Sequence, residues 1–274
     1  VLAYAGFSWG TYLEPVQKNG NAVSFVFDIS YSMMANDAPD KKTRLEAAAN
    51  YAQMLLSHMK GIPVTVVLAK GDGVLVVPLT EDKAVVETLL ESLNPKLISS
   101  VGTSLGKGII AAHKGFPTNS SLANRIWVFT DGDETDGLLE KSILDCVRSG
   151  VSVSLIGFGS EQEIQVIAGD GRTAGYTSLK SEKMKKIVAN VEKNSSAGIK
   201  NGVTVNYIDA TEAGSALKLL KTVSPKFNSK YEGNSITYEL KPVKRYSLFL
   251  GLAIFFFILG FFVTEFDIDN IVSK

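Results

Sequence analysis

The run Val23–Phe27, VSFVF, decides the fold: it is almost wholly apolar and stops at a charged residue, Asp28. An apolar run of this length without alternation is typical of a parallel strand buried on both faces. Similar runs recur along the chain, and helical patterns lie between them. From Thr43 to Met59, for example, apolar residues repeat at the spacing of a helix with one buried face. The sequence therefore predicts strands that alternate with helices.

This alternation extends from about residue 22 to residue 220. It predicts an α/β fold with a doubly wound, mostly parallel central sheet and helices on both faces. Two of the strands, VTVVLA and VLVVPLT, flank the turn Lys70–Gly73. The other expected strands are 125–130, 151–159 and 203–208, and the expected helices are 43–59, 81–93, 104–116, 138–148, 181–192 and 212–223.

The composition excludes several classes of protein. The chain has 274 residues and is 45% hydrophobic, which is too apolar for a disordered protein. Lys and Arg number 28, as do Asp and Glu, so no basic excess indicates a nucleic-acid partner. A single cysteine, Cys146, cannot form an intrachain disulfide or a cysteine-based zinc site, and two histidines cannot build a histidine-rich metal centre.

The segment 246–264, YSLFLGLAIFFFILGFFVT, carries no charged residue. As a helix rising about 1.5 Å per residue it would span roughly 28 Å, close to the hydrocarbon thickness of a bilayer. A buried core helix is the alternative, but core helices rarely run so far without polar residues. We expect a single transmembrane helix in contact with lipid. Basic residues precede it more often than they follow it, which taken alone favours a cytoplasmic domain: Lys230, Lys241, Lys244 and Arg245 before, Lys274 after.

These patterns divide the chain into five expected parts. The first residues, VLAYAGFSWG, read as the end of a truncated membrane span, although they are too short to cross a bilayer alone. The stretch before the apolar segment is polar and partly extended. The expected parts are an N-terminal segment 1–19, an α/β domain 20–223, a connector 224–245, a transmembrane helix 246–264 and a short tail 265–274.

Oxygen-bearing side chains follow the strands where each strand ends. In an open parallel sheet, ligands bind beyond the carboxyl ends of the strands. One group of side chains follows the first strand, a hydroxyl opens a helix after a glycine turn, and a carboxylate follows the strand RIWVFT. The five candidate metal-site residues are Asp28, Ser30, Ser32, Thr103 and Asp131.

An all-oxygen set of this kind favours a hard cation, Mg²⁺ first, with Mn²⁺ or Ca²⁺ as alternatives. Three of the five ligands are neutral hydroxyls, so the protein neutralises the ion only in part. A carboxylate from outside could then replace a bound water. The sequence predicts a site that captures an acidic side chain of a protein partner.

This set resembles the metal-ion-dependent adhesion site of von Willebrand factor type A (vWA) domains, over roughly residues 20–195. The resemblance implies that the five residues hold the metal, with Asp131 acting through water. The wider layout is similar to bacterial membrane-anchored vWA proteins of the aerotolerance-operon (Bat) type. The similar features are WGTYLEPVQKNG, GDGRTAGYTSL, YIDATEAGSALKLL and the C-terminal apolar segment.

The Bat resemblance implies a location and a system. It implies that the vWA domain lies outside the bacterial cytoplasmic (inner) membrane, on the periplasmic side, which opposes the count of basic residues. It also implies a scaffold or assembly role, without enzyme activity, alongside a MoxR-type AAA+ ATPase in stress or oxygen tolerance.

Three other motifs occur in the sequence. Gly102–Gly106 fits the G-x-S-x-G nucleophile elbow, but no clear strand precedes it and no histidine follows His113. A Mg²⁺-dependent phosphohydrolase or phosphotransferase with Asp28 as nucleophile is the rival function, although Ser30 stands where a second carboxylate is usual. The segment 131–137 resembles an EF-hand loop, but its glycine is one position late. Its acidic residues are interpreted as rim charges, with a partner contact as the alternative: Asp133, Glu134 and Asp136.

Overall fold

A computed structural model describes residues 8–17, 20–117, 122–167, 173–195, 202–223, 236–244 and 246–265. The chain divides into two compact units, one formed by residues 19–234 and one by residues 1–18 with 235–274.

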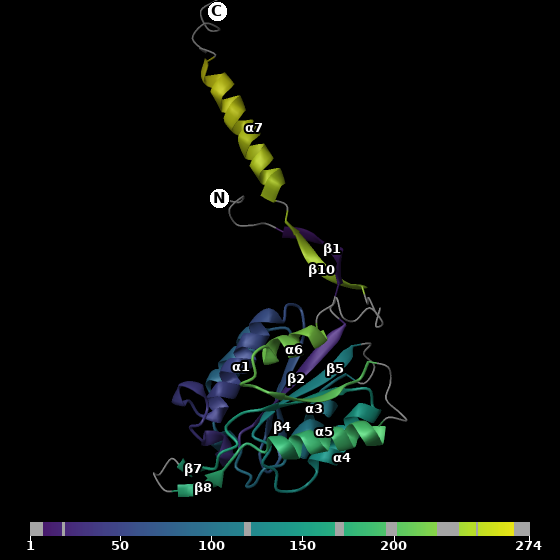
Figure 1. Cartoon of the computed structure of the whole chain (residues 1–274). Coiled ribbons are helices and arrows are strands. Elements are labelled where there is room, and N and C mark those ends of the chain that lie inside the picture. The colour runs from purple at the N-terminus through teal and green to yellow at the C-terminus, as the bar shows by residue number, and fades with distance from the viewer. Residues whose placement is uncertain are drawn as a thin grey trace, which may run out of the picture. The chain divides into compact units, whose positions relative to one another are not determined.

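The larger unit contains the predicted sheet, with six strands in the order β4-β3-β2-β5-β6-β9 (Figure 1). All neighbours are parallel except β3 and β4. The four-residue turn 70–73 requires this exception, because so short a connection can join only antiparallel strands. The strands are β2 (Asn21–Asp28), β3 (Val64–Ala69), β4 (Gly73–Thr80), β5 (Ala123–Thr130), β6 (Ser152–Gly157) and β9 (Val205–Asp209).

Three helices cover each face of this sheet and bury its alternate side chains (Figure 1). Phe25, Phe27 and Phe129 face one layer, where Phe27 and Phe129 stack with ring centroids 4.6 Å apart. That layer consists of α1 (Arg44–His58), α2 (Lys83–Glu91) and α6 (Ser215–Val223). The opposite layer consists of α3 (Leu105–Lys114), α4 (Leu139–Arg148) and α5 (Ser181–Ser195). The α/β fold with a mostly parallel sheet is confirmed.

A small hairpin was not predicted. β7 (Ile164–Ile167) and β8 (Thr173–Thr177) pair antiparallel after β6. Both lie against η1 (Tyr31–Met34), the short 3-10 helix that follows β2. The strands are four and five residues long, and their flanks carry few apolar residues, so no periodic pattern marked them. Two further 3-10 turns, η2 (Pro39–Lys41) and η3 (Pro95–Leu97), lie in connections.

The smaller unit pairs two strands that are distant in sequence. β1 (Ser8–Gln17) runs antiparallel to β10 (Ile236–Lys244), with Ser8 opposite Lys244 and Gln17 opposite Ile236. Residues 8–17 are therefore a strand, where the sequence suggested the end of a membrane span, and residues 236–244 of the expected connector are its partner. Residues 1–7 and 224–235 lie outside the described part of the chain.

Helix α7 (Tyr246–Glu265) occupies the expected membrane segment. In the described part of the chain, no helix combines the length and apolarity that crossing a bilayer requires. The predicted transmembrane helix is therefore not confirmed. Side chains of α7 are described for residues 249–260, which at about 1.5 Å per residue cover roughly 18 Å, less than the roughly 30 Å hydrocarbon core. Of the expected tail 265–274, residues 266–274 lie outside the described residues.

Candidate metal site at the carboxyl edge of the sheet

Asp28 ends β2 and lies fully buried at the carboxyl edge of the sheet. The backbone N–H of Ser30 donates to Asp28 Oδ1 at 2.9 Å, and the Thr130 hydroxyl donates to Asp28 Oδ2 at 2.7 Å. Thr130 is adjacent because β2 and β5 are neighbouring parallel strands. Burial, and then repulsion by the Asp131 carboxylate, raises the pKa of Asp28 to about 7. This edge of the sheet therefore favours a positive charge next to Asp28.

The two serines of the first loop face the same place. Ser30 is extended at the start of η1, and its hydroxyl lies 2.9 Å from the hydroxyl of Ser32. Ser32 also forms a side-chain hydrogen bond with Asp131, which acts to lower the pKa of that carboxyl. Four predicted residues therefore meet within one hydrogen-bonded group, which we call the edge cluster: Asp28, Ser30, Ser32 and Asp131.

Asp131 is the second buried carboxylate of the edge cluster, and it has a cationic partner that sequence reasoning missed. Arg44 Nη1 donates to Asp131 Oδ2 at 2.7 Å, and both side chains are fully buried. The backbone N–H of Asp133 donates to Asp131 Oδ1 at 3.1 Å. Burial raises the pKa of Asp131, against the opposing effect of the Arg44 charge. The spacing of the helix could have indicated that Arg44 is buried, because Arg44 lies one helical turn before Ala48, on the buried face of α1.

The same guanidinium connects several loops around the edge cluster. Arg44 Nε and Nη2 donate to the two carboxylate oxygens of Asp37 at 2.8 and 2.6 Å, and Nη1 also reaches the Thr177 hydroxyl at 3.2 Å. Asp37 in turn accepts from the N–H of Ser160 at 2.8 Å. Arg44 therefore joins the loop after β2, the end of β5, the segment after β6 and the hairpin strand β8.

Thr103, the fifth predicted residue, is buried just before α3. Its N–H donates to the Thr135 hydroxyl at 3.1 Å, and that hydroxyl donates back to the Thr103 carbonyl at 2.9 Å. Gly102 makes this turn at a φ of +87°, where a side chain would be strained and would meet Thr135. The structure thus ties Thr103 to the loop that follows Asp131. Its own hydroxyl makes no hydrogen bond within the described residues and so is available as a ligand.

The acidic residues after Asp131 have structural partners. Glu134 accepts from the N–H of Leu139 at 2.6 Å, and burial raises the pKa of Glu134. Asp136 accepts from the Ser104 hydroxyl and, at 3.2 Å, from the N–H of Leu138. Glu134 and Asp136 therefore help to start α4, beyond their expected role as rim charges. The bond to Asp136, together with the N-cap bond from Lys107 N–H, gives Ser104 a structural role in place of a nucleophile elbow.

The donor set fits a hard divalent cation. Among the described residues, no group of three or more His, Cys, Asp or Glu side chains could hold a metal. The edge cluster has two carboxylates, and its remaining donors are hydroxyls. Arg44 shares its single positive charge between Asp37 and Asp131. The carboxylates of Asp28, Asp37 and Asp131 taken together therefore keep an excess of negative charge. Oxygen donors with residual negative charge are the ligands that Mg²⁺ and Ca²⁺ prefer.

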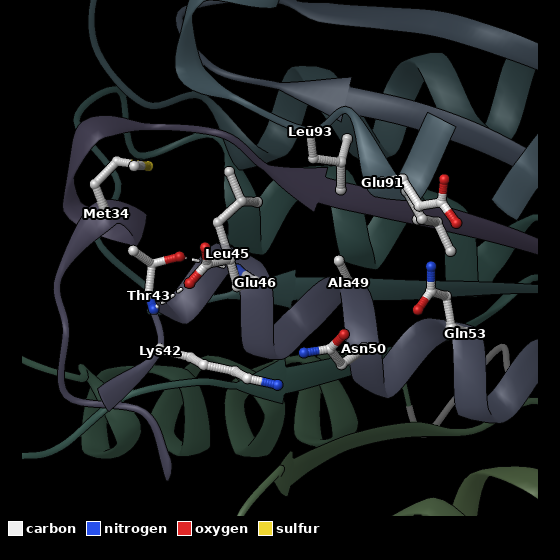
Figure 2. Close-up of a pocket in the computed structure, with 11 residues that line it drawn as sticks. Met34, Lys42, Thr43, Leu45, Glu46, Ala49, Asn50, Gln53, Glu91 and Leu93 are labelled. Carbon is white, nitrogen blue, oxygen red and sulfur yellow. Dashed lines mark hydrogen bonds between the residues drawn. The ribbon is translucent and has the colours of Figure 1, made fainter. Parts of the chain in front are cut away.

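A separate hollow on the described surface lies away from the edge cluster. It has a volume of about 520 Å³ and lies along α1 beside the end of α2, with Leu45, Ala49 and Leu93 among its lining (Figure 2). Thr43 and Glu46 form the capping box that starts α1 at its rim, as the dashed lines show (Figure 2). Met34 lies at one end of the hollow, directly after the first metal loop. No predicted site residue lines it.

A family model for the von Willebrand factor type A domain matches residues 23–134, which include all five predicted site residues. The chain contains a vWA domain. Domains of this family commonly bind a divalent cation at the adhesion site and mediate protein–protein interactions. A comparison with curated proteins gave no match.

Solved structures with this vWA fold include two from Bacteroides. BatB from Bacteroides thetaiotaomicron is 25% identical with a TM-score of 0.64, and the alignment covers 76% of this chain and 98% of that one. An aerotolerance-related membrane protein from Bacteroides fragilis is 24% identical, with a TM-score of 0.62 and the same coverages. Proximal thread matrix protein 1 of the mussel byssus, with zinc in its adhesion site, is 15% identical at a TM-score of 0.51, over 78% of this chain and 48% of that one. The resemblance to vWA proteins of the Bat type is therefore confirmed.

Proposed function

We propose that the vWA domain, 20–223, binds a divalent cation, Mg²⁺ first, and uses it to capture an acidic group of a protein partner. Asp28, Ser30, Ser32 and Thr103 would hold the ion, and Asp131 would act through water. The ion would act as the Lewis acid to which a carboxylate of the partner binds. The protein's own residues supply the oxygen ligands in fixed positions, and because most of these ligands are neutral hydroxyls, their total negative charge is low.

The observation that carries this proposal is the pairing of two buried carboxylates from neighbouring strands with hydroxyls at one sheet edge. Burial raises the pKa of both Asp28 and Asp131, and repulsion by Asp131 raises the pKa of Asp28 further, so the ionised pair is unfavourable without a further cation. Buried charges persist in proteins when they are paired or bind metals. Arg44 pairs with Asp131, while Asp28 has hydrogen-bond donors but no cationic partner among the described residues.

Calorimetric titration of the metal-free protein with Mg²⁺ tests the metal site. Wild type should bind, and Asp28→Asn, which keeps the shape of the side chain but removes its charge, should lose at least about tenfold in affinity. Asp145→Asn, which removes an exposed carboxylate from α4, is the matched control and should bind like wild type. Equal affinities for wild type and Asp28→Asn would exclude Asp28 from the site.

We also propose that the chain is anchored to the bacterial inner membrane through residues 246–264, with the vWA domain on the outer, periplasmic side. Two observations support the anchor. The side chains of residues 250–260 are all exposed, with Phe257 at 78%, and the Bacteroides fragilis neighbour is described as a membrane protein. An exposed, uncharged helix of this composition gains free energy in lipid. Flotation with liposomes should carry the full chain upward and leave a variant ending at residue 245 behind.

A MoxR-type AAA+ ATPase system in stress or oxygen tolerance is the partner system that the Bat resemblance favours. In this role the chain would act as a scaffold without catalysis of its own. Co-purification from membranes in Mg²⁺ and in EDTA tests it: an ATPase of this type should be recovered in Mg²⁺ and lost in EDTA. Recovery that is the same in both would separate the partner from the metal site.

The rival phosphotransferase function gains no support from the geometry. Its nucleophile, Asp28, has no exposed surface, and both of its oxygens accept hydrogen bonds. A nucleophile must present a free oxygen to the phosphorus. A phosphatase screen with Mg²⁺ in which turnover is abolished by Asp28→Asn would reverse this ranking.

A further inference from the structure

The edge cluster is bordered on one side by three exposed apolar side chains from three segments. Tyr31 in η1 is 47% exposed, Leu97 in η3 is 45% exposed, and Val101, two residues before Thr103, is 94% exposed. We call these three residues the apolar rim. Tyr31 stands between Ser30 and Ser32, so the rim begins inside the first metal loop itself.

The turn after β3 connects these three segments into one surface. Lys70 Nζ lies 4.9 Å from the centre of the Tyr31 ring and donates to the carbonyls of Pro95 and Ile98 at 2.7 and 2.9 Å. Gly71 packs against the backbone of Val101 so closely that no Cβ would fit there. Tyr31, η3 and Val101 therefore all surround the same turn.

The apolar rim is unlike isolated exposed apolar residues, which are common on any protein surface. Here three such side chains from separate segments gather beside a polar, charged site, the pattern expected of a binding surface. Two ammonium groups lie within it: Lys70, and Lys107, whose Nζ donates to the Gly71 carbonyl at 3.0 Å. Asp136 also borders this surface, because it accepts from the hydroxyl of Ser104, whose backbone N–H donates to the carbonyl of Lys70.

We propose that the apolar rim selects the partner: an extended segment in which a large apolar residue stands next to the acidic residue that reaches the metal. The inference rests on the proposed function of the edge cluster and names the partner chemistry of that site. The apolar neighbour packs on Tyr31, Leu97 and Val101. The two lysines complement the negative charge of the acidic residue, and the Asp136 carboxylate disfavours segments that carry further carboxylates.

Two biotinylated peptides immobilised at high density test this selection by biolayer interferometry in Mg²⁺. One carries Leu-Asp-Leu and the other Ser-Asp-Ser between identical Gly-Ser flanks. Wild type should bind the leucine peptide about tenfold more tightly, as expected for burying one aliphatic side chain. The double variant Leu97→Ser, Val101→Ser should lose most of that preference, while its calorimetric affinity for Mg²⁺ stays at the wild-type value.

Val85→Ser is the matched control. Val85 is 49% exposed on α2, which begins after Thr80. Thr80 pairs with Val64, the first residue of β3, so α2 begins at the sheet edge opposite the edge cluster. This variant should keep the tenfold preference. If wild type binds magnesium but binds the two peptides with equal affinity, or binds neither peptide, the inference is overturned while the proposed metal site stands. Absence of magnesium binding by wild type would overturn the proposed function and the inference with it.

Discussion

Replacing Arg44 by Met removes a buried cation that four side-chain hydrogen bonds hold in place. The guanidinium makes two bonds to Asp37, one to Asp131 and one to Thr177, and none of its surface is exposed. Met keeps most of the apolar stem and its helix propensity, so packing of α1 changes little. What remains is a buried Asp131 without a cationic partner and an Asp37 that is almost as well covered.

The magnitude follows from this loss. Breaking a buried ion pair by removing one partner costs about 3–5 kcal/mol, because the remaining charge is left desolvated. A domain of this size is stable by roughly 5–15 kcal/mol, so Arg44→Met should lower the free energy of unfolding by about a fifth or more. Arg44→Lys keeps the charge but cannot donate to both oxygens of Asp37 and to Asp131 together, so it should fall between wild type and Met.

Urea unfolding in EDTA measures this effect without any contribution from metal. The residues 20–223 of wild type, Arg44→Met and Arg44→Lys would be compared at pH 7.5, with Lys185→Met as the control. Lys185 pairs with Glu182 on the exposed face of α5, and since exposed ion pairs contribute little, its removal should leave the free energy of unfolding near the wild-type value. A loss below about 1 kcal/mol for Arg44→Met would refute the reasoning, since the carboxylates would then not depend on the guanidinium.

Three further changes test other parts of the fold. The raised pKa of Asp28 favours its protonated form in the folded state, so the stabilising effect of Asp28 is present at acid pH and is lost as pH rises through about 7. Asp28→Asn should therefore gain stability relative to metal-free wild type between pH 4 and pH 8, by at most about 4 kcal/mol. A stability difference between the two proteins that does not change with pH in urea unfolding would contradict this. Thr43→Ala removes the hydroxyl of the α1 capping box and should cost about 1 kcal/mol by thermal unfolding, while Thr88→Ala, mid-helix on α2, should cost little. Gly108→Ala adds a good helix former to α3, yet its Cβ would lie 2.7 Å from Ala69 Cβ and 2.9 Å from Val26 Cγ1. The crowding should outweigh the gain in helix propensity and lower stability by about 1–3 kcal/mol. A rise in melting temperature would show that the contact between α3 and the sheet can relax.

Local patterns predicted the elements of the larger unit well. The apolar runs at Val23–Phe27 and 64–69 became β2 and β3, and the periodic stretch 43–59 became α1, shortened by one residue at each end. Continuous apolar runs and helical periodicity report burial directly, so they locate elements without knowledge of the fold. The short hairpin β7–β8 and the pairing of β1 with β10 carried no such pattern.

The candidate site could be predicted because of a general property of parallel sheets. Residues that follow adjacent strands meet at one edge, so Asp28 and Asp131 were expected together although 103 positions separate them in sequence. The sequence places Tyr31 between the two serines of the first metal loop, but Leu97 and Val101 come near it only through the turn after β3, whose contacts join segments that are distant in sequence.

The sequence by itself determined the order of strands and helices, the class of fold and the oxygen-rich residues at the strand ends, because these depend on local periodicity and on what lies directly after each strand. Tertiary structure alone decided that β1 pairs with β10 and that Arg44 is buried against Asp131, 87 residues away. The physical reason is that a side chain's burial and charge partners depend on segments brought together in space, which no local spacing records.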